Sequence, residues 1–301
     1  MNITVLGNQG AIPKPGKFSS SLLLNVSNIN ILIDCCEGVQ YQLRKNKIKL
    51  SKIELILISH AHGDHYFGLI GLITTMSLLR RKKKLTIFCP EAVFKIIQYH
   101  IDISKIKLSY DLNMIKISHE DEMCIFENQT FSIFKFPLKH SVETNGFLIK
   151  EKNKKRKLNI KNALEKNIDK VYFNKLKKGQ NVINRDGLLI HYEEVTEDGP
   201  IPKSFAYCSD TIFFDKLVEY VNEVDLLYCE TTFLKKHKDK AKITFHSTTI
   251  DAANLAKNAK VKKLLIGHFS SRYDSYDDFE NEVKPIFNNV IISEEGKKIL
   301  V

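Results

Sequence analysis

The residues best suited to metal chemistry lie in the segment His60-Ala-His-Gly-Asp-His65. This segment follows the apolar run 54–59, which is short, rich in Leu and Ile, and typical of a buried strand that ends in a loop. Residues two apart on an extended backbone point the same way. His60 and His62 can therefore bind one metal ion together.

The second half of the segment predicts a second metal site. Gly63 permits a sharp turn, after which Asp64 and His65 point toward a different ion. Imidazole and carboxylate are the ligands that zinc accepts when a site keeps one position open for water. The pattern therefore predicts a catalytic metal centre rather than a group of solvated histidines.

Apolar runs and turn residues predict the elements that position these side chains. The alternation of strands and helices, with no Pro/Gly/Ser-rich linker, favours one layered domain with an insertion. A helix at 211–221 follows from the helix-start character of Asp210-Thr211. Strands are expected at 2–6, 21–26, 30–35, 54–59, 85–89, 113–117, 123–127, 131–138, 145–149, 204–208, 224–229, 263–267 and 289–293, and the other helices at 38–46, 66–81, 91–101, 248–258 and 277–286.

The His-rich segment resembles the signature of the metallo-β-lactamase superfamily. The resemblance implies an α/β (α+β) fold, a four-layer αββα sandwich with metal ions at the edge between two sheets. It also implies three further ligands at strand ends, and the chain offers His140, Asp210 and His268, each just after an apolar run. The superfamily includes thioester hydrolases, phosphodiesterases and nucleases, so this signature predicts the chemistry but not the substrate.

Three more segments resemble the ribonuclease Z family of tRNA 3′-processing endonucleases. The first is Asp34-Cys-Cys-Glu-Gly-Val-Gln40, with Cys36 and Val39 where the family usually has Gly and Thr. The others are Gly267-His-Phe-Ser-Ser-Arg-Tyr273, and Glu230-Thr-Thr-Phe followed by His246-Ser-Thr248. The opening segment 6–20 is also similar, so the resemblance covers nearly the whole chain. It implies removal of the 3′ trailer from precursor tRNA, with a 3′-hydroxyl left on the tRNA and a 5′-phosphate on the trailer.

The resemblance also implies a set of site residues. We expect two Zn²⁺ ions per subunit, although the same ligands also accept Mn²⁺ or Fe²⁺. Asp64 is expected to orient the attacking water, and His246, held by Glu230, to protonate the leaving 3′ oxygen. Arg272 and Ser270 are expected to contact phosphate. The expected ligands are His60, His62 and His140 for one ion, Asp64, His65 and His268 for the other, and Asp210 bridging the two.

Most of the excess positive charge lies in one segment. Residues 150–178 contain twelve Lys or Arg and three Asp or Glu, a net charge of +9 against +11 for the whole chain. Apolar residues are sparse between 158 and 176, which favours an arm inserted at 150–200 into a single domain spanning 1–301. Lysines give affinity for phosphates without sequence readout. We expect this arm to bind precursor tRNA, with Lys175, Lys177 and Lys178 among the contacts.

Composition favours a cytoplasmic protein. The six cysteines show no disulfide framework, and most lie in apolar runs, as in proteins of a reducing compartment. No segment has signal-peptide character or enough apolar length to span a bilayer, so no membrane association is expected. The family resemblance further implies a homodimer in which the arm of one subunit holds tRNA for the other.

Two other functions remain open from sequence. A small-phosphodiester or thioester hydrolase of the same fold needs the metal ligands but has no need of the Lys-rich arm or of the Glu230 and His246 elements. A non-catalytic RNA-binding relative has no need of the metal ligands, yet every ligand position here is filled. Both features favour the nuclease.

Overall fold

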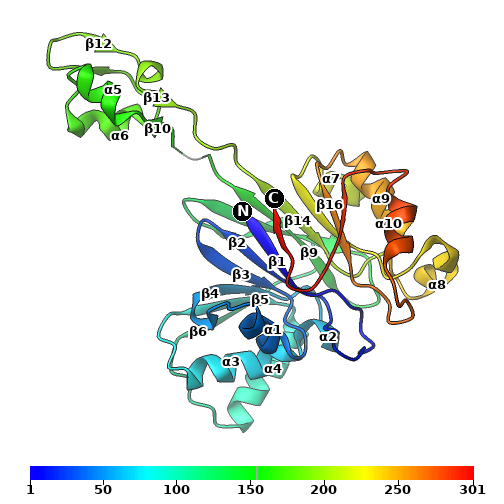
Figure 1. Cartoon of the computed structure of the whole chain (residues 1–301). Coiled ribbons are helices and arrows are strands. Elements are labelled where there is room, and N and C mark those ends of the chain that lie inside the picture. Colours follow the sequence, from blue (N-terminus) through cyan, green and yellow to red (C-terminus); the bar gives the residue numbers. More distant parts are fainter. Residues whose placement is uncertain (154) are drawn as a thin grey trace. The chain divides into compact units, whose positions relative to one another are not determined.

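The chain forms two compact units, each with its own core. The computed structural model describes residues 1–153 and 155–301 (Figure 1). The larger unit consists of residues 1–150 and 203–301, and the smaller unit of residues 151–202.

The first of two seven-stranded sheets in the larger unit has the strand order β18-β1-β2-β3-β4-β5-β6. Strands β3 to β6 run parallel to one another, whereas β1, β2 and β18 pair antiparallel. The central strands are almost continuously apolar because both faces of the sheet are covered. The bounds are β1 Asn2–Gly7, β2 Ser21–Val26, β3 Ile29–Ile33, β4 Ile53–Leu57, β5 Leu85–Cys89, β6 Leu112–Lys116 and β18 Lys298–Leu300.

The second sheet has the order β17-β16-β15-β14-β9-β8-β7. Its strands β14 to β17 are parallel, and β9 pairs antiparallel with β14. All parallel strands of one sheet end at the same edge, so residues that follow them are brought together there. The bounds are β7 Met123–Glu127, β8 Phe131–Leu138, β9 Thr144–Glu151, β14 Ser204–Cys208, β15 Leu226–Glu230, β16 Leu264–Gly267 and β17 Val290–Ile292.

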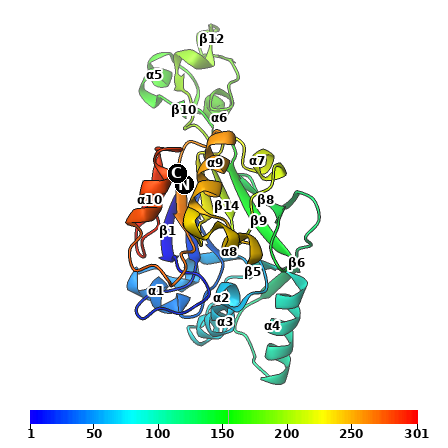
Figure 2. The same cartoon turned by 90° about the vertical axis from the view of Figure 1, so that its right-hand side faces the viewer.

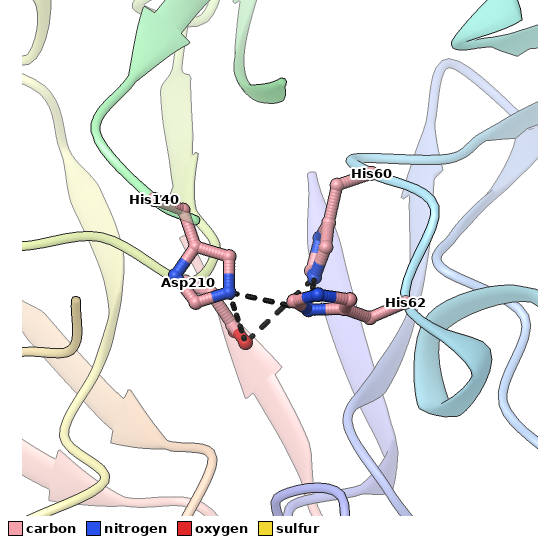
Figure 3. A group of neighbouring side chains, drawn as sticks. All are labelled: His60, His62, His140 and Asp210. Atoms are coloured by element: carbon pink, nitrogen blue, oxygen red, sulfur yellow. Dashed lines mark hydrogen bonds and ion pairs between the residues drawn. The ribbon is translucent and has the colours of Figure 1, made fainter. Parts of the chain in front are cut away.

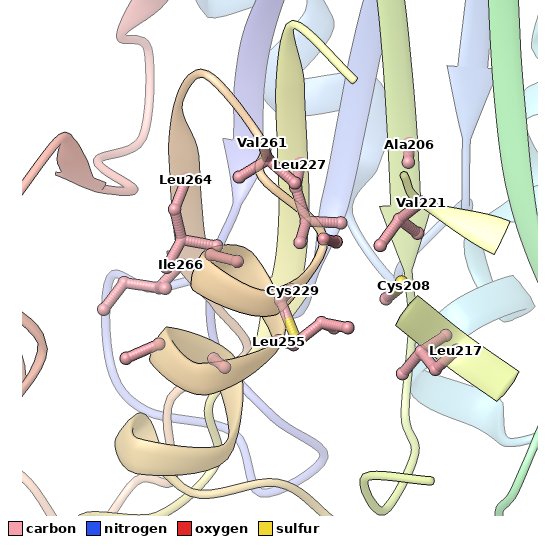
Figure 4. Packing of buried hydrophobic residues seen from close by; sticks show 14 of the residues in the cluster. Ala206, Cys208, Leu217, Val221, Leu227, Cys229, Leu255, Val261, Leu264 and Ile266 are labelled. Carbon is pink, nitrogen blue, oxygen red and sulfur yellow. The ribbon is translucent and has the colours of Figure 1, made fainter. Parts of the chain in front are cut away.

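Helices cover the outer faces of the two sheets, and this confirms the predicted αββα sandwich (Figure 2). One apolar cluster lies between the sheets, and one lies between each sheet and its helices. Figure 4 shows the cluster beneath α9, where Leu255 faces Cys229 and Ile266 of the second sheet. The helices are α1 Val39–Lys45, α2 Gly63–Tyr66, α3 Gly68–Leu78 and α4 Glu91–Ile103 on the first half, and α7 Lys216–Tyr220, α8 Lys238–Ile243, α9 Thr249–Asn258 and α10 Asp277–Val283 on the second, with short 3-10 turns η1 Leu50–Lys52 and η4 Lys235–His237.

The helix expected at 211–221 is much shorter than its sequence pattern indicated. Only Lys216–Tyr220 is helical, because the residue after Asp210 forms hydrogen bonds with other parts of the chain. The Thr211 backbone donates to Glu230 and its hydroxyl accepts from the Lys139 backbone, so this residue joins two strand ends instead of starting a helix. The helix-start pattern was overridden by tertiary hydrogen bonds.

The basic run 80–84 after α3 contains a buried cation. Arg81 is almost fully buried. Its guanidinium donates to the carbonyls of Leu50, Ser51, Ile53, Lys83 and Lys84, which ties β4 to the loop before β5. Arg81 therefore stabilises a loop, because a buried guanidinium needs an acceptor for each of its donors.

The smaller unit contains short elements around an apolar cluster of its own. The cluster consists of Ala163, Ile168, Leu176, Val182, Ile190 and Val195, so the expectation that this segment buries little was wrong. Between 158 and 176 the chain forms a short helix that Asn159 caps and a 3-10 turn that Asp169 caps, followed by a second short helix. The elements are β10 Lys157–Leu158, α5 Ile160–Glu165, η2 Lys170–Tyr172, α6 Phe173–Leu176, β11 Val182–Ile183, β12 Leu189–Ile190, η3 Tyr192–Glu194 and β13 Thr196–Glu197.

Among the described residues, no helix combines the length and the apolar character that a membrane crossing requires.

Candidate metal centre and active site

Five of the predicted ligands directly follow strand ends at one edge of the sandwich, and the other two, Asp64 and His65, lie on the short helix α2. His60 and His62 come after β4, and His140 comes after β8. Asp210 follows β14, and His268 follows β16. The strand directions and the sheet order thus bring together residues that are more than two hundred positions apart in sequence.

The first group of ligands consists of three imidazoles and one carboxylate (Figure 3). The Nδ1 atom of His62 lies 3.1 Å from Nε2 of His60 and 3.2 Å from Nε2 of His140. The Asp210 Oδ2 atom lies 3.8 Å from both Nε2 atoms. Four ligands about 2.0–2.1 Å from a tetrahedral zinc ion are about 3.3 Å apart, so this spacing suits one ion.

The second group is formed by Asp64, His65 and His268, with the other oxygen of Asp210. The Asp64 Oδ2 atom lies 3.2 Å from Nε2 of His65 and 3.6 Å from Nε2 of His268. The Asp210 Oδ1 atom lies 3.6 Å and 3.3 Å from the same two nitrogens. Asp210 therefore presents one oxygen to each group, as a bridging carboxylate does.

The second group also contains buried polar atoms that need a partner. Within the described ranges, Asp64 Oδ2, His65 Nε2, Asp210 Oδ1 and His268 Nε2 are buried without forming a hydrogen bond. Buried polar groups are almost always satisfied, and four orphaned atoms facing one point suit a cation. The donor set fits a divalent metal ion at each group.

The electrostatics of the site agree with this assignment. Burial lowers the pKa of His60 well below its usual value, which keeps the ring in the neutral form that binds metal. Burial alone lowers the pKa of His65 too, but Asp64, Asp210 and Asp34 outweigh it and raise that pKa well above its usual value. Three carboxylates that hold a proton on His65 can equally hold a cation.

Asp34 fixes the orientation of His65 from behind. Its Oδ2 atom accepts from His65 Nδ1 at 2.8 Å and from the hydroxyl of Tyr207 at 2.7 Å. The backbone and hydroxyl of Ser59 donate to the same carboxylate, and the Ser59 hydroxyl also contacts His60 Nδ1 at 2.9 Å. Asp34 thus holds His65 directly and His60 through Ser59, and these contacts at Nδ1 leave the Nε2 atom of each ring toward its group of candidate ligands.

The other ligands are held in the same way. The Thr232 hydroxyl contacts Nδ1 of His268 at 2.8 Å, and the carbonyl of Phe245 accepts from Nδ1 of His140 at 2.9 Å. His268 has a φ of 60°, a left-handed conformation that is rare for a residue other than glycine. Strained backbone of this kind is tolerated where the surrounding structure fixes a functional side chain.

Glu230 and His246 form a buried pair beside the ligands. Glu230 accepts from His246 Nδ1 at 3.0 Å, and from the backbones of Thr211, Thr232 and Ser247. Burial lowers the pKa of His246, but the charge of Glu230 outweighs burial and raises that pKa to about 9. His246 is therefore cationic at neutral pH and can donate a proton.

A cleft of about 750 Å³ opens over these residues. Its lining includes the predicted phosphate contacts Ser270 and Arg272, and the Arg272 Nε atom donates to the Ser270 hydroxyl at 3.1 Å. Lys175, Lys177 and Lys178 belong to the smaller unit, where the Lys175 ammonium lies 5.4 Å from the centre of the Tyr172 ring.

Comparison with known proteins places the chain in a family. A protein called ribonuclease Z from Cytophaga hutchinsonii is 38% identical over 99% of this chain and 95% of its own length. Ribonuclease Z from Phocaeicola vulgatus is 35% identical over 99% of this chain and 97% of its own. The chain belongs to the ribonuclease Z family. This confirms the resemblance that the Asp34, Glu230 and Gly267 segments indicated.

Solved structures agree with the family and the fold. The crystal structure of human tRNase Z, short form, covers 100% of this chain with a TM-score of 0.72 and 25% identity. The metallo-β-lactamase fold protein YhfI from Bacillus subtilis covers 99% with a TM-score of 0.70 and 18% identity, which supports the fold alone. Residues 1–186 also match a family model described as Anti-Pycsar protein Apyc1, and this part of the chain belongs to that family. The ribonuclease Z relatives, by contrast, extend along nearly the whole chain.

Sequence reasoning missed several residues that support this ribonuclease Z site. Asp34 and Thr232 lie within the recognised segments and were not singled out, although a buried carboxylate after a strand is itself a signal. Ser59, Tyr207 and the Phe245 carbonyl have no such signal, because only the folded chain brings them to the imidazoles. The sequence also gives no signal for the contact of His237 with the Tyr273 hydroxyl at 2.7 Å.

Proposed function

We propose that this endoribonuclease removes the 3′ trailer from precursor tRNA, leaving a 3′-hydroxyl on the tRNA and a 5′-phosphate on the trailer. The supporting observation is the arrangement around Asp210: its two oxygens face two separate groups of ligands, and the His246–Glu230 pair lies beside them. A hydrolysis that leaves a 3′-hydroxyl requires an activated water on one side of the phosphate and a proton donor on the other.

We propose Zn²⁺ as the ion in both groups, with two ions per subunit. His60, His62 and His140 hold one ion, Asp64, His65 and His268 hold the other, and Asp210 belongs to both. When bound, two such ions supply an activated water and neutralise charge on the phosphate. The ligand set also accepts Mn²⁺ or Fe²⁺.

The protein's own residues move and position the protons. Asp64 lines the cleft and orients the attacking water. On the far side of the phosphate, His246 gives its proton to the leaving 3′ oxygen, and Glu230 keeps the imidazole charged and correctly turned. Arg272 and Ser270 contact the phosphate oxygens.

Replacement of Asp34 by Asn tests the support behind His65. The variant keeps the volume of the side chain but loses the charge that faces Nδ1 of His65. We expect the affinity for the ion held by His65 to fall about 10- to 100-fold, as for other changes behind a metal-ligating His. Competition with a chromogenic chelator measures this affinity. Equal affinity in the variant and the wild type contradicts the role of Asp34.

We propose that the smaller unit binds the body of the tRNA through its lysines. Lys175, Lys177 and Lys178 form no ion pair within the described residues, whereas Lys166 pairs with Glu194. We also propose that the protein is a cytoplasmic homodimer in which this unit serves the partner's site. The free, mostly buried cysteines are typical of a reducing compartment.

Salt dependence tests the three lysines. Simultaneous replacement of Lys175, Lys177 and Lys178 by Ala is expected to weaken tRNA binding. It is also expected to reduce the slope of log K against log salt by about one unit for each phosphate that the variant no longer neutralises. Filter binding at several salt concentrations gives the slope. The matched control replaces Lys82, Lys83 and Lys84 by Ala, an equal change of charge in the larger unit. Equal slopes in the two triple variants contradict the assignment.

The proposed reaction is tested with a 3′-extended precursor tRNA, with and without chelator. We expect one cut next to the mature 3′ end, a 5′-phosphate on the released trailer, and loss of cleavage on chelation. Cleavage at scattered positions, or a phosphate left on the tRNA, overturns the proposal.

A competition assay separates this reaction from that of a small-phosphodiester hydrolase. If tRNA is the substrate, bulk tRNA inhibits hydrolysis of a small chromogenic phosphodiester. Absence of inhibition favours the alternative enzyme.

A further inference from the structure

The lining of the active-site cleft includes exposed apolar side chains that have no part in the proposed chemistry. Phe67 and Phe245 line the cleft with 61% and 41% of their surface exposed, and Ile243 is exposed beside them. Isolated exposed apolar residues are common, but aromatic rings gathered over a catalytic centre indicate a ligand with a flat apolar part.

Phe67 is exposed but fixed in position. Its ring lies directly over Gly63, where an added Cβ would come within 2.1 Å of the ring carbons. The glycine of the metal-binding segment therefore leaves room for this ring next to Asp64 and His62. The far end of the ring thus packs against Gly63, while much of the side chain remains exposed in the lining of the cleft.

Phe245 is held in place by an unusual backbone conformation. Its φ is 55°, at the position after α8 where the left-handed conformation favours glycine. The backbone of His246 donates to the Ala241 carbonyl, which completes this helix end. The same conformation aims the Phe245 carbonyl at His140 and keeps the ring beside His246 in the lining of the cleft.

Cationic side chains also lie in and near the cleft. The Arg272 guanidinium lies 5.1 Å from the centre of the Phe233 ring at the floor of the cleft. The segment 235–242 adds five exposed lysines, and in the part of the chain that the structure describes none of them forms an ion pair. Exposed aromatic rings next to unpaired cations are the chemistry that binds single-stranded nucleic acid, by base stacking and phosphate contact.

We propose that Phe67 and Phe245 form a slot for the two unpaired nucleobases that flank the scissile phosphate, an inference that rests on the proposed function. The last retained nucleotide carries the leaving 3′ oxygen and must face His246, so its base stacks on Phe245. The base of the first removed nucleotide stacks on Phe67, across the metal ligands. The lysines of 235–242 lie on the side of Phe245 and contact phosphates of the retained RNA. Cleavage thus requires unpaired bases on both sides of the cut.

The test combines ring removal with base removal. Precursor tRNA is prepared with an abasic nucleotide at the last retained or the first removed position, and kcat/KM is measured for the wild type, Phe67→Ala and Phe245→Gly. On unmodified RNA each variant is expected to lose about 5- to 100-fold. Phe245→Gly is expected to differ from the wild type by less than about 2-fold in kcat/KM on RNA that lacks the last retained base. The same is expected of Phe67→Ala on RNA that lacks the first removed base.

Phe245→Gly is chosen because glycine adopts the required backbone conformation without strain. Its thermal stability and metal content are expected to equal or exceed those of the wild type, so a loss of activity reports on the ring. Phe67→Tyr keeps an aromatic face and serves as the matched control for Phe67→Ala, with at least half of wild-type activity expected.

The outcomes separate the slot from the proposed reaction. Suppose that the wild type cuts the precursor but each variant loses the same factor in kcat/KM on normal and on abasic RNA. The slot is then overturned and the reaction stands. The same conclusion follows if Phe245→Gly responds to the first removed base and Phe67→Ala to the last retained base. If the wild type does not cut, stacking is read from quenching of 2-aminopurine at the first removed position in a His246→Ala background. Equal quenching with and without Phe67 overturns the slot independently of cleavage.

Discussion

Replacement of Asp210 by Asn is expected to abolish cleavage of precursor tRNA, with a loss of about 10³-fold or more in kcat/KM. Loss of a residue that only supports a metal ligand typically costs about 10–100-fold, and Asp210→Asn is expected to cost more because it weakens both metal sites directly. An amide offers one neutral oxygen where the carboxylate faces His60 and His140 with one oxygen and His268 with the other. Metal analysis after dialysis is expected to show fewer than two ions per chain in the variant and two in the wild type.

Asp225 provides a matched control for that experiment. It is a buried aspartate of the same half of the sandwich, but it pairs with Lys203 and Lys262 instead of histidines. Asp225→Asn is expected to lower the melting temperature while leaving the metal content unchanged. If both variants keep two ions, or if Asp210→Asn cuts RNA at the wild-type rate, the bridging role is wrong.

Replacement of His246 by Ala is expected to lower kcat about 10²–10⁴-fold with little change in metal content. The Nδ1 atom of the imidazole contacts Glu230 at 3.0 Å, which suits a proton donor. His246 also lies close enough to Asp210 and His268 to be a metal ligand, so the two roles need an experiment that distinguishes them. Parallel measurement of kcat and bound metal distinguishes the two roles. Loss of one ion together with activity shows that His246 is a ligand.

The pH dependence of kcat is a second test of His246 as the proton donor. A proton donor acts in its protonated form, and Glu230 raises the pKa of His246 to about 9 in spite of burial. The kcat of the wild type is therefore expected to hold up to about pH 9 and to fall above it. Glu230→Gln removes the charge that stabilises the imidazolium, so the alkaline fall is expected to move to lower pH. An unchanged profile contradicts the pairing.

The fold and the groups of ligands could be predicted because strong local patterns coincide with them. A buried parallel strand followed by His60-Ala-His-Gly-Asp-His65 needs no tertiary information to indicate a metal site. The three remote ligands required the family resemblance as well, since His140, Asp210 and His268 are single polar residues after apolar runs. The direction of the strands explains why such residues meet.

Other features depended on contacts that no local pattern contains. The helix expected at 211–221 is shortened because Thr211 bonds Glu230 and the Lys139 backbone. The core of the smaller unit is built from apolar residues spread between 163 and 195, outside any helical period. The sequence does not predict that the rings of Phe67 and Phe245 line the cleft, because their positions depend on contacts with Gly63 and His140 in the folded chain.

Stepwise restoration of metal tests the central claim most directly. The protein is stripped with chelator and titrated with Zn²⁺ by calorimetry, while cleavage of precursor tRNA is followed in parallel. We predict two equivalents bound per chain, with full activity only after the second. Full cleavage by the stripped protein, or binding of a single equivalent that Asp210→Asn leaves unchanged, contradicts the account.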